Sequence, residues 1–113
     1  MAIEEYFATG PAFERPVFDA VLEVLHGCDP ALWFEPVSVG IFFKRRTTFV
    51  QLRTMTKWVA VGFSLPVELR SPRLSRKVVH HGQRYFHVVN VSDASQIDEE
   101  LASWLVEAWV ADA

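Results

Sequence analysis

Three of the four histidines, His80, His81 and His87, lie in one short stretch, HHGQRYFHVVNV. Neutral imidazole nitrogens bind transition metals, and an imidazole that titrates near neutral pH can act as a general acid or base. The stretch therefore raises the question of a metal site or an acid–base site. It also alternates like a β-strand, which is typical of histidines with a structural role.

The spacing around residues 82–83 predicts a hairpin rather than a metal site. Gly-Gln between KVVHH and RYFHVVNV is typical of a two-residue turn with glycine first. In this register His81 faces Arg84, and His87 lies opposite Val78, away from the other two histidines. A zinc site needs several ligands about 2 Å from one point. We therefore expect no metal ligands here, and we expect His87 to be a core or half-buried residue with a hydrogen-bonded ring.

Other motifs for catalysis or cofactor binding are missing from the sequence. Cys28 is the only cysteine, so the chain has no internal disulfide and no CxxC motif, and the neighbouring Asp29 disfavours a thiolate. There is no glycine-rich phosphate loop, no nucleophile elbow and no pair of carboxylates in a strand context. We therefore expect no catalytic residues and no cofactor, which favours a protein that is not an enzyme.

Charge is strongly segregated along the chain, although the net charge is only −3. Between Lys44 and Arg84 the only acidic residue is Glu68, whereas the two flanking segments contain one basic residue, Arg15. A split of this kind can create a surface for anionic partners. It can equally allow acidic helices to neutralise a basic sheet of the same protein. Both interpretations remain open at this point.

Two segments have the apolar spacing of amphipathic helices. Residues 15–27 form the first, and residues 92–109 form the second, with Asp98, Glu99 and Glu100 in its first turn. The second helix has two alternative caps, a capping box of Asp93 with Gln96 or a cap by Ser95. Its apolar stripe contains Ile97, Leu101, Trp104, Leu105 and Ala108.

Between these helices the pattern predicts extended structure. The segments VSVGIFFKR, TTFVQLR and KWVAVGFSL are rich in β-branched and aromatic residues and predict three antiparallel strands. The hairpin around residues 82–83 adds two more. In the third strand, one face carries only small residues between Trp58 and Ser64, so we expect another group to approach it closely. The chain is therefore expected to be a single α+β domain, residues 1–113, with an antiparallel sheet of about five strands packed against an N-terminal and a C-terminal helix.

The run FFKRRTTF carries the densest positive charge and is the sharpest candidate for a binding surface. A turn within KRRTT would expose all three basic side chains, and nearby aromatic residues could stack on nucleic-acid bases. Arg73 and His87 are added as further candidates. The candidate ligand- or partner-binding residues are Lys44, Arg45, Arg46, Arg53, Lys57, Trp58, Arg73 and His87.

The order of these motifs resembles a bacterial domain-of-unknown-function family, DUF5655, over most of the chain. The resemblance rests on Phe49, on Arg73 in SPR, on His87, and on the helix DEEL…WL…A from Asp98 to Leu105. It implies an α+β domain that occurs alone or joined to other domains, some of them nuclease-like, with no established activity. A more distant similarity to frataxin-like domains implies iron handling. The acidic ligands would then come from Glu4, Glu5, Asp19 and Glu23.

Three functions are compatible with these features. The first is a non-enzymatic binding or accessory module whose basic surface meets an anionic partner, either nucleic acid or an acidic protein. The second is a small metal-handling or hydrolytic protein that uses His80, His81 or His87. The third is a structural homodimer that packs through Trp58 or Trp109. The acidic start and the lack of an apolar run of about 18 residues favour a cytoplasmic protein without a membrane partner.

Overall fold

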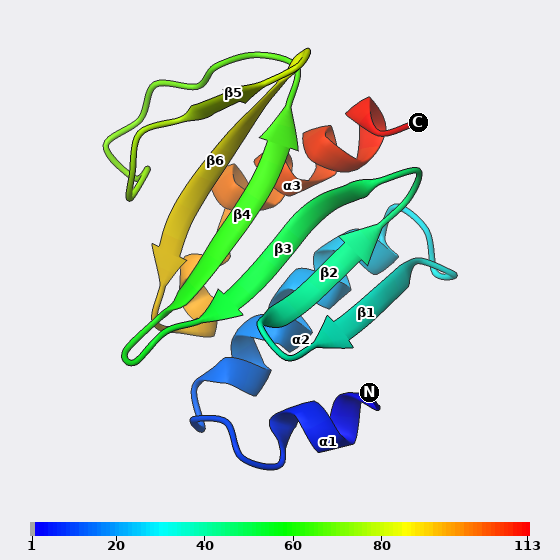
Figure 1. The fold of residues 1–113 in the computed structure, drawn as a ribbon, viewed down its shortest axis with the longest axis vertical. Coiled ribbons are helices and arrows are strands. Elements are labelled where there is room, and N and C mark those ends of the chain that lie inside the picture. The colour runs from blue at the N-terminus through cyan, green and yellow to red at the C-terminus, as the bar shows by residue number, and fades with distance from the viewer. Residues whose placement is uncertain (1) are drawn as a thin grey trace.

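A computed structural model describes residues 2–113 of the 113-residue chain and shows an α+β fold. Helices and strands follow the order expected from the sequence, with helices at both ends and strands between them (Figure 1). The elements are α1 (Ile3–Phe7), α2 (Glu14–His26), β1 (Trp33–Val37), β2 (Gly40–Lys44), β3 (Thr48–Thr54), β4 (Val59–Leu65), β5 (Val79–His81), β6 (Arg84–Val91), the 3-10 helix η1 (Ala94–Gln96) and α3 (Glu99–Ala111).

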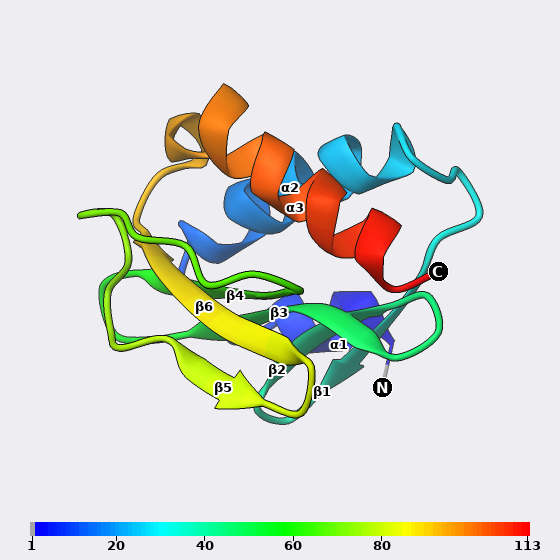
Figure 2. The ribbon, with the colours of Figure 1, turned by 90° about the horizontal axis from the view of Figure 1, so that it is seen from above.

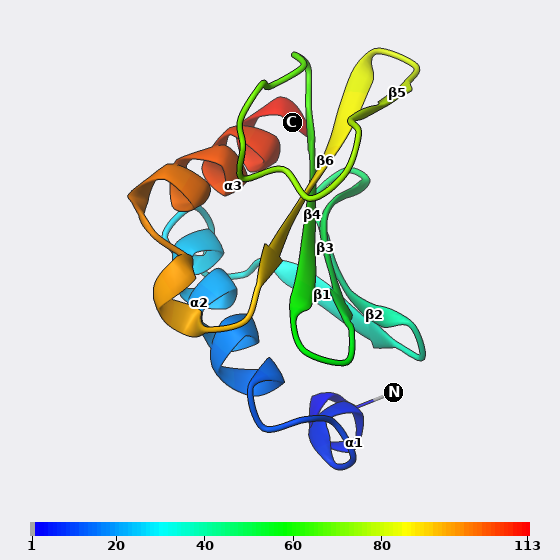
Figure 3. The same cartoon turned by 90° about the vertical axis from the view of Figure 1, so that its left-hand side faces the viewer.

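The strands form one antiparallel sheet in the order β1-β2-β3-β4-β6-β5. Figures 2 and 3 show α2 and α3 side by side against one face of this sheet, whereas no helix of residues 2–113 covers the opposite face. The α+β prediction is therefore confirmed. The open sheet face is the side on which side chains of β3, β4 and β6 can meet a ligand.

The sheet has six strands rather than the expected five, because VSVGIFFKR is not one strand. Residues 38–39 form a tight turn that pairs Val37 with Gly40 and separates β1 from β2. Val37 before this turn and Val39 within it are strand-forming residues, so the sequence pattern predicts extended structure here. Gly40 is required here because a Cβ would lie 2.1 Å from the Leu52 carbonyl oxygen of the neighbouring strand.

The core lies between the two long helices and the inner sheet face. Val17, Val21 and Leu25 of α2 are fully buried, as are Leu101 and Leu105 of α3. Burying one such side chain stabilises the fold by about 1.5–3 kcal/mol relative to leaving it exposed. The apolar stripes predicted from helical spacing therefore position both helices. No helix in the described part of the chain is long and apolar enough to cross a bilayer.

The predicted helix 92–109 is divided in two. Asp93 and Gln96 form the capping box, but it belongs to the short helix η1. The chain then leaves helical geometry at Ile97 and restarts at Asp98, whose carboxylate accepts a hydrogen bond from Leu101 N at 3.0 Å. The prediction of one continuous helix was wrong because two capping signals follow each other, and each begins its own helix.

Candidate ligand-binding surface

The hairpin that carries His80 and His81 has the predicted register, with His81 opposite Arg84. The His80 ring stacks on Tyr85 at a centroid distance of 4.5 Å, whereas His81 lies beside the open sheet face. Adjacent strand residues point to opposite faces, so the two imidazoles diverge. Among residues 2–113, no group of three or more His, Cys, Asp or Glu side chains is arranged to hold a metal ion.

His87 lies inside the core at 1% exposure. Its Nε2 accepts a hydrogen bond from Leu69 N at 2.9 Å, so the proton of the neutral ring is on Nδ1. The carbonyl groups of Phe63 and Tyr85 lie near the ring, but none makes a well-aligned bond with Nδ1. Burial lowers the pKa of His87 despite these neighbours. The residue therefore holds the β4–β5 connection against the sheet and does not face the solvent.

The basic turn between β2 and β3 contacts the C-terminal end of α3. Arg45 Nη1 donates to the Trp109 carbonyl at 2.9 Å, and its guanidinium lies 3.7 Å from the centre of the Trp109 ring. The backbone N–H of Arg46 donates to Asp112 Oδ2 at 2.8 Å. Lys44 pairs with Glu35 at 2.9 Å. Positive charge at a helix C-terminus is stabilising, so this turn is engaged within the fold.

Arg73 contacts the other end of α3. Its Nη1 lies 2.9 Å from Asp98 Oδ1 and 3.0 Å from Glu100 Oε1, and its Nη2 donates to the Gln96 carbonyl. Hydrogen bonds to these two carboxylates, Asp98 first, raise the pKa of Arg73 above its ordinary value. Arg84 donates to the Ala111 carbonyl at 2.6 Å. Arg45, Arg73 and Arg84 are therefore bound to the ends of α3, but only part of the basic middle of the chain is neutralised in this way.

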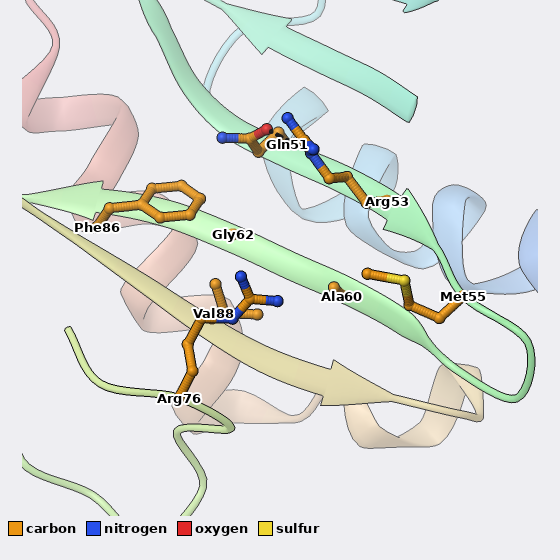
Figure 4. Close-up of a pocket in the computed structure, with 8 residues that line it drawn as sticks. All are labelled: Gln51, Arg53, Met55, Ala60, Gly62, Arg76, Phe86 and Val88. Atoms are coloured by element: carbon orange, nitrogen blue, oxygen red, sulfur yellow. Dashed lines mark hydrogen bonds between the residues drawn. The ribbon is translucent and has the colours of Figure 1, made fainter. Parts of the chain in front are cut away.

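Arg53 and Arg76 have a different environment on the open sheet face. They line one hollow of about 260 Å³, with Arg53 on β3 and Arg76 on the β4–β5 connection (Figure 4). Arg53 Nε donates to Gln51 Oε1 at 3.2 Å. Neither guanidinium forms an ion pair with any acidic group of the described chain. The remaining lining residues are Gln51, Met55, Ala60, Gly62, Phe86 and Val88.

The floor of this hollow consists of Ala60 and Gly62, the small residues that predicted a close approach to β4. The approaching group is the Phe86 ring, which would meet a Cβ at residue 62 at 2.3 Å. A second hollow of about 610 Å³ shares Gln51 and Phe86 with the first and extends toward Arg84. The two hollows together form a band across β3, β4 and β6, which we call the sheet-face groove.

The predicted candidates are therefore divided among several places. Arg53 lies in the groove, whereas Lys57 and Trp58 lie in the β3–β4 turn, where Trp58 is 38% exposed. Lys44, Arg45, Arg46 and Arg73 are bound elsewhere, and His87 is in the core. Sequence reasoning missed Arg76, because VELRSPRLSRK gave no register that would place it over the sheet.

Comparison with known proteins supports the resemblance noted from the motifs. The family model described as "Domain of unknown function (DUF5655)" matches residues 3–111. The chain belongs to this family. No curated protein and no solved structure matches the chain. For this DUF5655 domain the similarity to frataxin-like proteins stays a prediction, and its surface must be interpreted from its own geometry.

Proposed function

We propose that this DUF5655 domain is a binding module that holds an anionic ligand in the sheet-face groove. One observation carries the proposal: Arg53 and Arg76 line the same hollow, and neither has an acidic partner among residues 2–113. Two guanidinium groups present several planar N–H donors, which suit the oxygens of phosphate and carboxylate groups. An anionic ligand would supply the partner that the fold does not.

The surroundings of the two arginines favour single-stranded nucleic acid as the ligand. The groove is open and crosses an antiparallel sheet, and the Phe86 ring, which lines it above Gly62, offers a stacking surface. Trp58, beside Lys57, adds an exposed aromatic ring just before the start of β4. Sheets that combine basic and aromatic side chains bind single strands through backbone charge and base stacking. An acidic protein surface is the alternative partner of the same charge.

Salt-dependent binding tests this proposal directly. Fluorescence anisotropy with labelled single-stranded DNA and RNA would compare the unaltered protein with the double variant Arg53→Gln/Arg76→Gln. Loss of two phosphate contacts should flatten the slope of log affinity against log salt by about 1.4, at about 0.7 per contact. The matched control is Arg15→Gln/Arg70→Gln, which removes the same charge from two exposed residues outside the groove and should leave most of the affinity intact.

The result also separates the two kinds of partner. If the unaltered protein binds polyglutamate but no nucleic acid at about 50 mM salt, where electrostatic attraction is strong, an acidic protein is the partner. If it binds neither polymer, or if both double variants lose affinity equally, the groove is not the binding site and the proposal is wrong.

A further inference from the structure

A buried carboxyl group lies at the opposite end of β3 from the basic turn. Glu14, the first residue of α2, is only 5% exposed. Its carboxylate accepts a hydrogen bond from the Thr54 hydroxyl, and Tyr6 lines the same hollow. No basic side chain of residues 2–113 forms an ion pair with it. A buried carboxylate without a cation is costly, because hydrogen bonds from neutral groups offset only part of its lost hydration.

The groups around Glu14 cannot themselves supply a full positive charge. Burial, with the nearby Glu14 acting in the same direction, raises the pKa of Tyr6 to about 12, so the Tyr6 hydroxyl stays neutral. The N-terminus of α2 contributes about half an elementary charge. The nearest basic residue in sequence, Arg15, has its guanidinium over the Phe7 ring at 5.1 Å. The negative charge is therefore only partly compensated within the protein.

Glu14 also lines a hollow of about 200 Å³, together with residues of α1, the β1–β2 turn and the end of β3. Figures 1 and 3 show α1 near the β1–β2 turn. Its walls combine the hydroxyl-bearing residues Thr9 and Ser38 with the apolar side chains of Pro11 and Val39. Gly10 approaches the carboxyl group so closely that a Cβ there would lie 2.3 Å from Glu14 Oε1. The hollow therefore offers one buried negative group, several oxygen acceptors and room for a short alkyl chain.

We propose that this hollow, bounded by Tyr6, Gly10, Glu14, Ser38, Val39 and Thr54, binds a primary ammonium group on a short alkyl chain. The ammonium would donate to Glu14 and to hydroxyl oxygens, since it has three donors and no acceptor. The alkyl chain would lie against Val39 and Pro11. This site selects charge of the opposite sign from the sheet-face groove and is independent of the function proposed for that groove.

Two-dimensional NMR with n-propylammonium chloride tests the site. We expect saturable shifts at the backbone amides of Gly10, Ser38 and Thr54, with a Kd in the millimolar range typical of a ligand this small. Neutral n-propanol, which has the same shape, should produce none. Tetramethylammonium, which carries the charge without N–H donors, should bind more weakly. Glu14→Gln should lower the affinity for propylammonium about tenfold or more, whereas the exposed control Glu23→Gln should leave it unchanged.

Two results would overturn this inference: shifts that do not saturate with propylammonium, or equal saturation by propanol and propylammonium. The comparison of these ligands needs only the unaltered protein, so it decides the question even if Glu14→Gln fails to fold. Arg53→Gln/Arg76→Gln should keep the ammonium site intact. Failure at one site therefore leaves the test of the other unaffected.

Discussion

The Phe86 ring lies over Gly62, so close that a Cβ at residue 62 would stand 2.3 Å from Phe86 Cζ. The two residues occupy neighbouring strands, where Gly62 pairs with Val88 and Phe86 pairs with Ser64. Their contact is therefore diagonal across β4 and β6. It allows a large ring to cover the middle of the open sheet face, and this Phe86 ring lines both hollows of the groove.

Replacing Gly62 by alanine should displace this ring. Overpacking of this kind costs about 1–3 kcal/mol, and we expect a loss of that size in the free energy of unfolding, measured with urea. The same substitution in a Phe86→Ala background should cost clearly less, because the ring is then absent. Equal costs in both backgrounds would show that the ring does not constrain residue 62.

Trp104 provides a test of how α3 packs. It was predicted at the centre of the apolar stripe, but it is half-buried. The centre of its ring lies 5.8 Å from the centre of the Phe63 ring and 5.9 Å from the Arg73 guanidinium carbon. Trp104→Ala should therefore lower stability by about 3 kcal/mol, the low end of the range for large aromatic residues. Val110→Ala on the same helix, at 57% exposure, is the control and should cost less than about 0.5 kcal/mol. An unchanged melting temperature for Trp104→Ala would contradict this packing.

His87 should make stability depend on pH near neutrality. Burial lowers its pKa in the folded protein, so the unfolded chain takes up a proton first as the pH falls. The contribution of the neutral His87 ring to the free energy of unfolding is complete above about pH 6.5, the ordinary pKa of histidine. It decreases as the pH falls toward the pKa of His87 in the folded protein. His87→Gln, whose amide oxygen can accept from Leu69 N, should remove this part of the decrease in urea titrations. The exposed control His80→Gln should retain it, and an unchanged pH profile for His87→Gln would contradict the assignment.

Asp112 should make the stability of the fold depend on pH in the acid range. Burial alone would raise its pKa, but hydrogen bonds from the Thr47 side chain, the Thr47 backbone and the Arg46 backbone lower it below the ordinary value. The ionised Asp112 carboxylate therefore contributes to the free energy of unfolding above about pH 3.9, and this contribution is lost as the pH falls through the pKa of the folded state.

The variant Asp112→Asn should lose about 1–3 kcal/mol at neutral pH, because it weakens three hydrogen bonds, among them Thr47 Oγ1 to Oδ1 at 2.5 Å. It should also flatten the acid limb of the stability curve, whereas Asp19→Asn on an exposed helix position should not. Urea unfolding across the acid range measures both effects. An acid limb as steep as that of the unaltered protein would show that Asp112 is not a major contributor.

Local patterns were enough to predict the elements that depend on nearby residues. The apolar spacing of α2, the hairpin at Gly82 with its φ of 62°, and the small face of β4 are all properties of short segments. The turn at residues 38–39 was missed because Val37 before it and Val39 within it favour extended structure. The partners of the basic residues were not predictable in the same way, because Arg45 with Trp109 and Arg73 with Asp98 are far apart in sequence. Their meeting depends on where α3 docks against the sheet.

The basic turn provides the last prediction. From the sequence alone, replacing Lys44, Arg45 and Arg46 by serine should barely affect folding, as for exposed residues in general. The structure leads to a different expectation, because Arg45 binds the Trp109 carbonyl and ring, and Arg46 Nη1 lies 3.5 Å from the Ala113 carbonyl. Losing these contacts at the C-terminus of α3 should cost about 1–2 kcal/mol in urea unfolding. Lys44→Ser alone, which removes a partly exposed ion pair with Glu35, should cost less than about 1 kcal/mol.

The same triple variant also separates the basic turn from the sheet-face groove. Under conditions where it stays folded, it should keep most of its affinity for single-stranded nucleic acid, because Arg53 and Arg76 are unchanged. The opposite result would be a triple variant that is as stable as the unaltered protein but whose slope of log affinity against log salt is flattened by about 2. It would mean that all three side chains contact phosphate. The turn would then be the binding surface, and its contacts with α3 would be incidental.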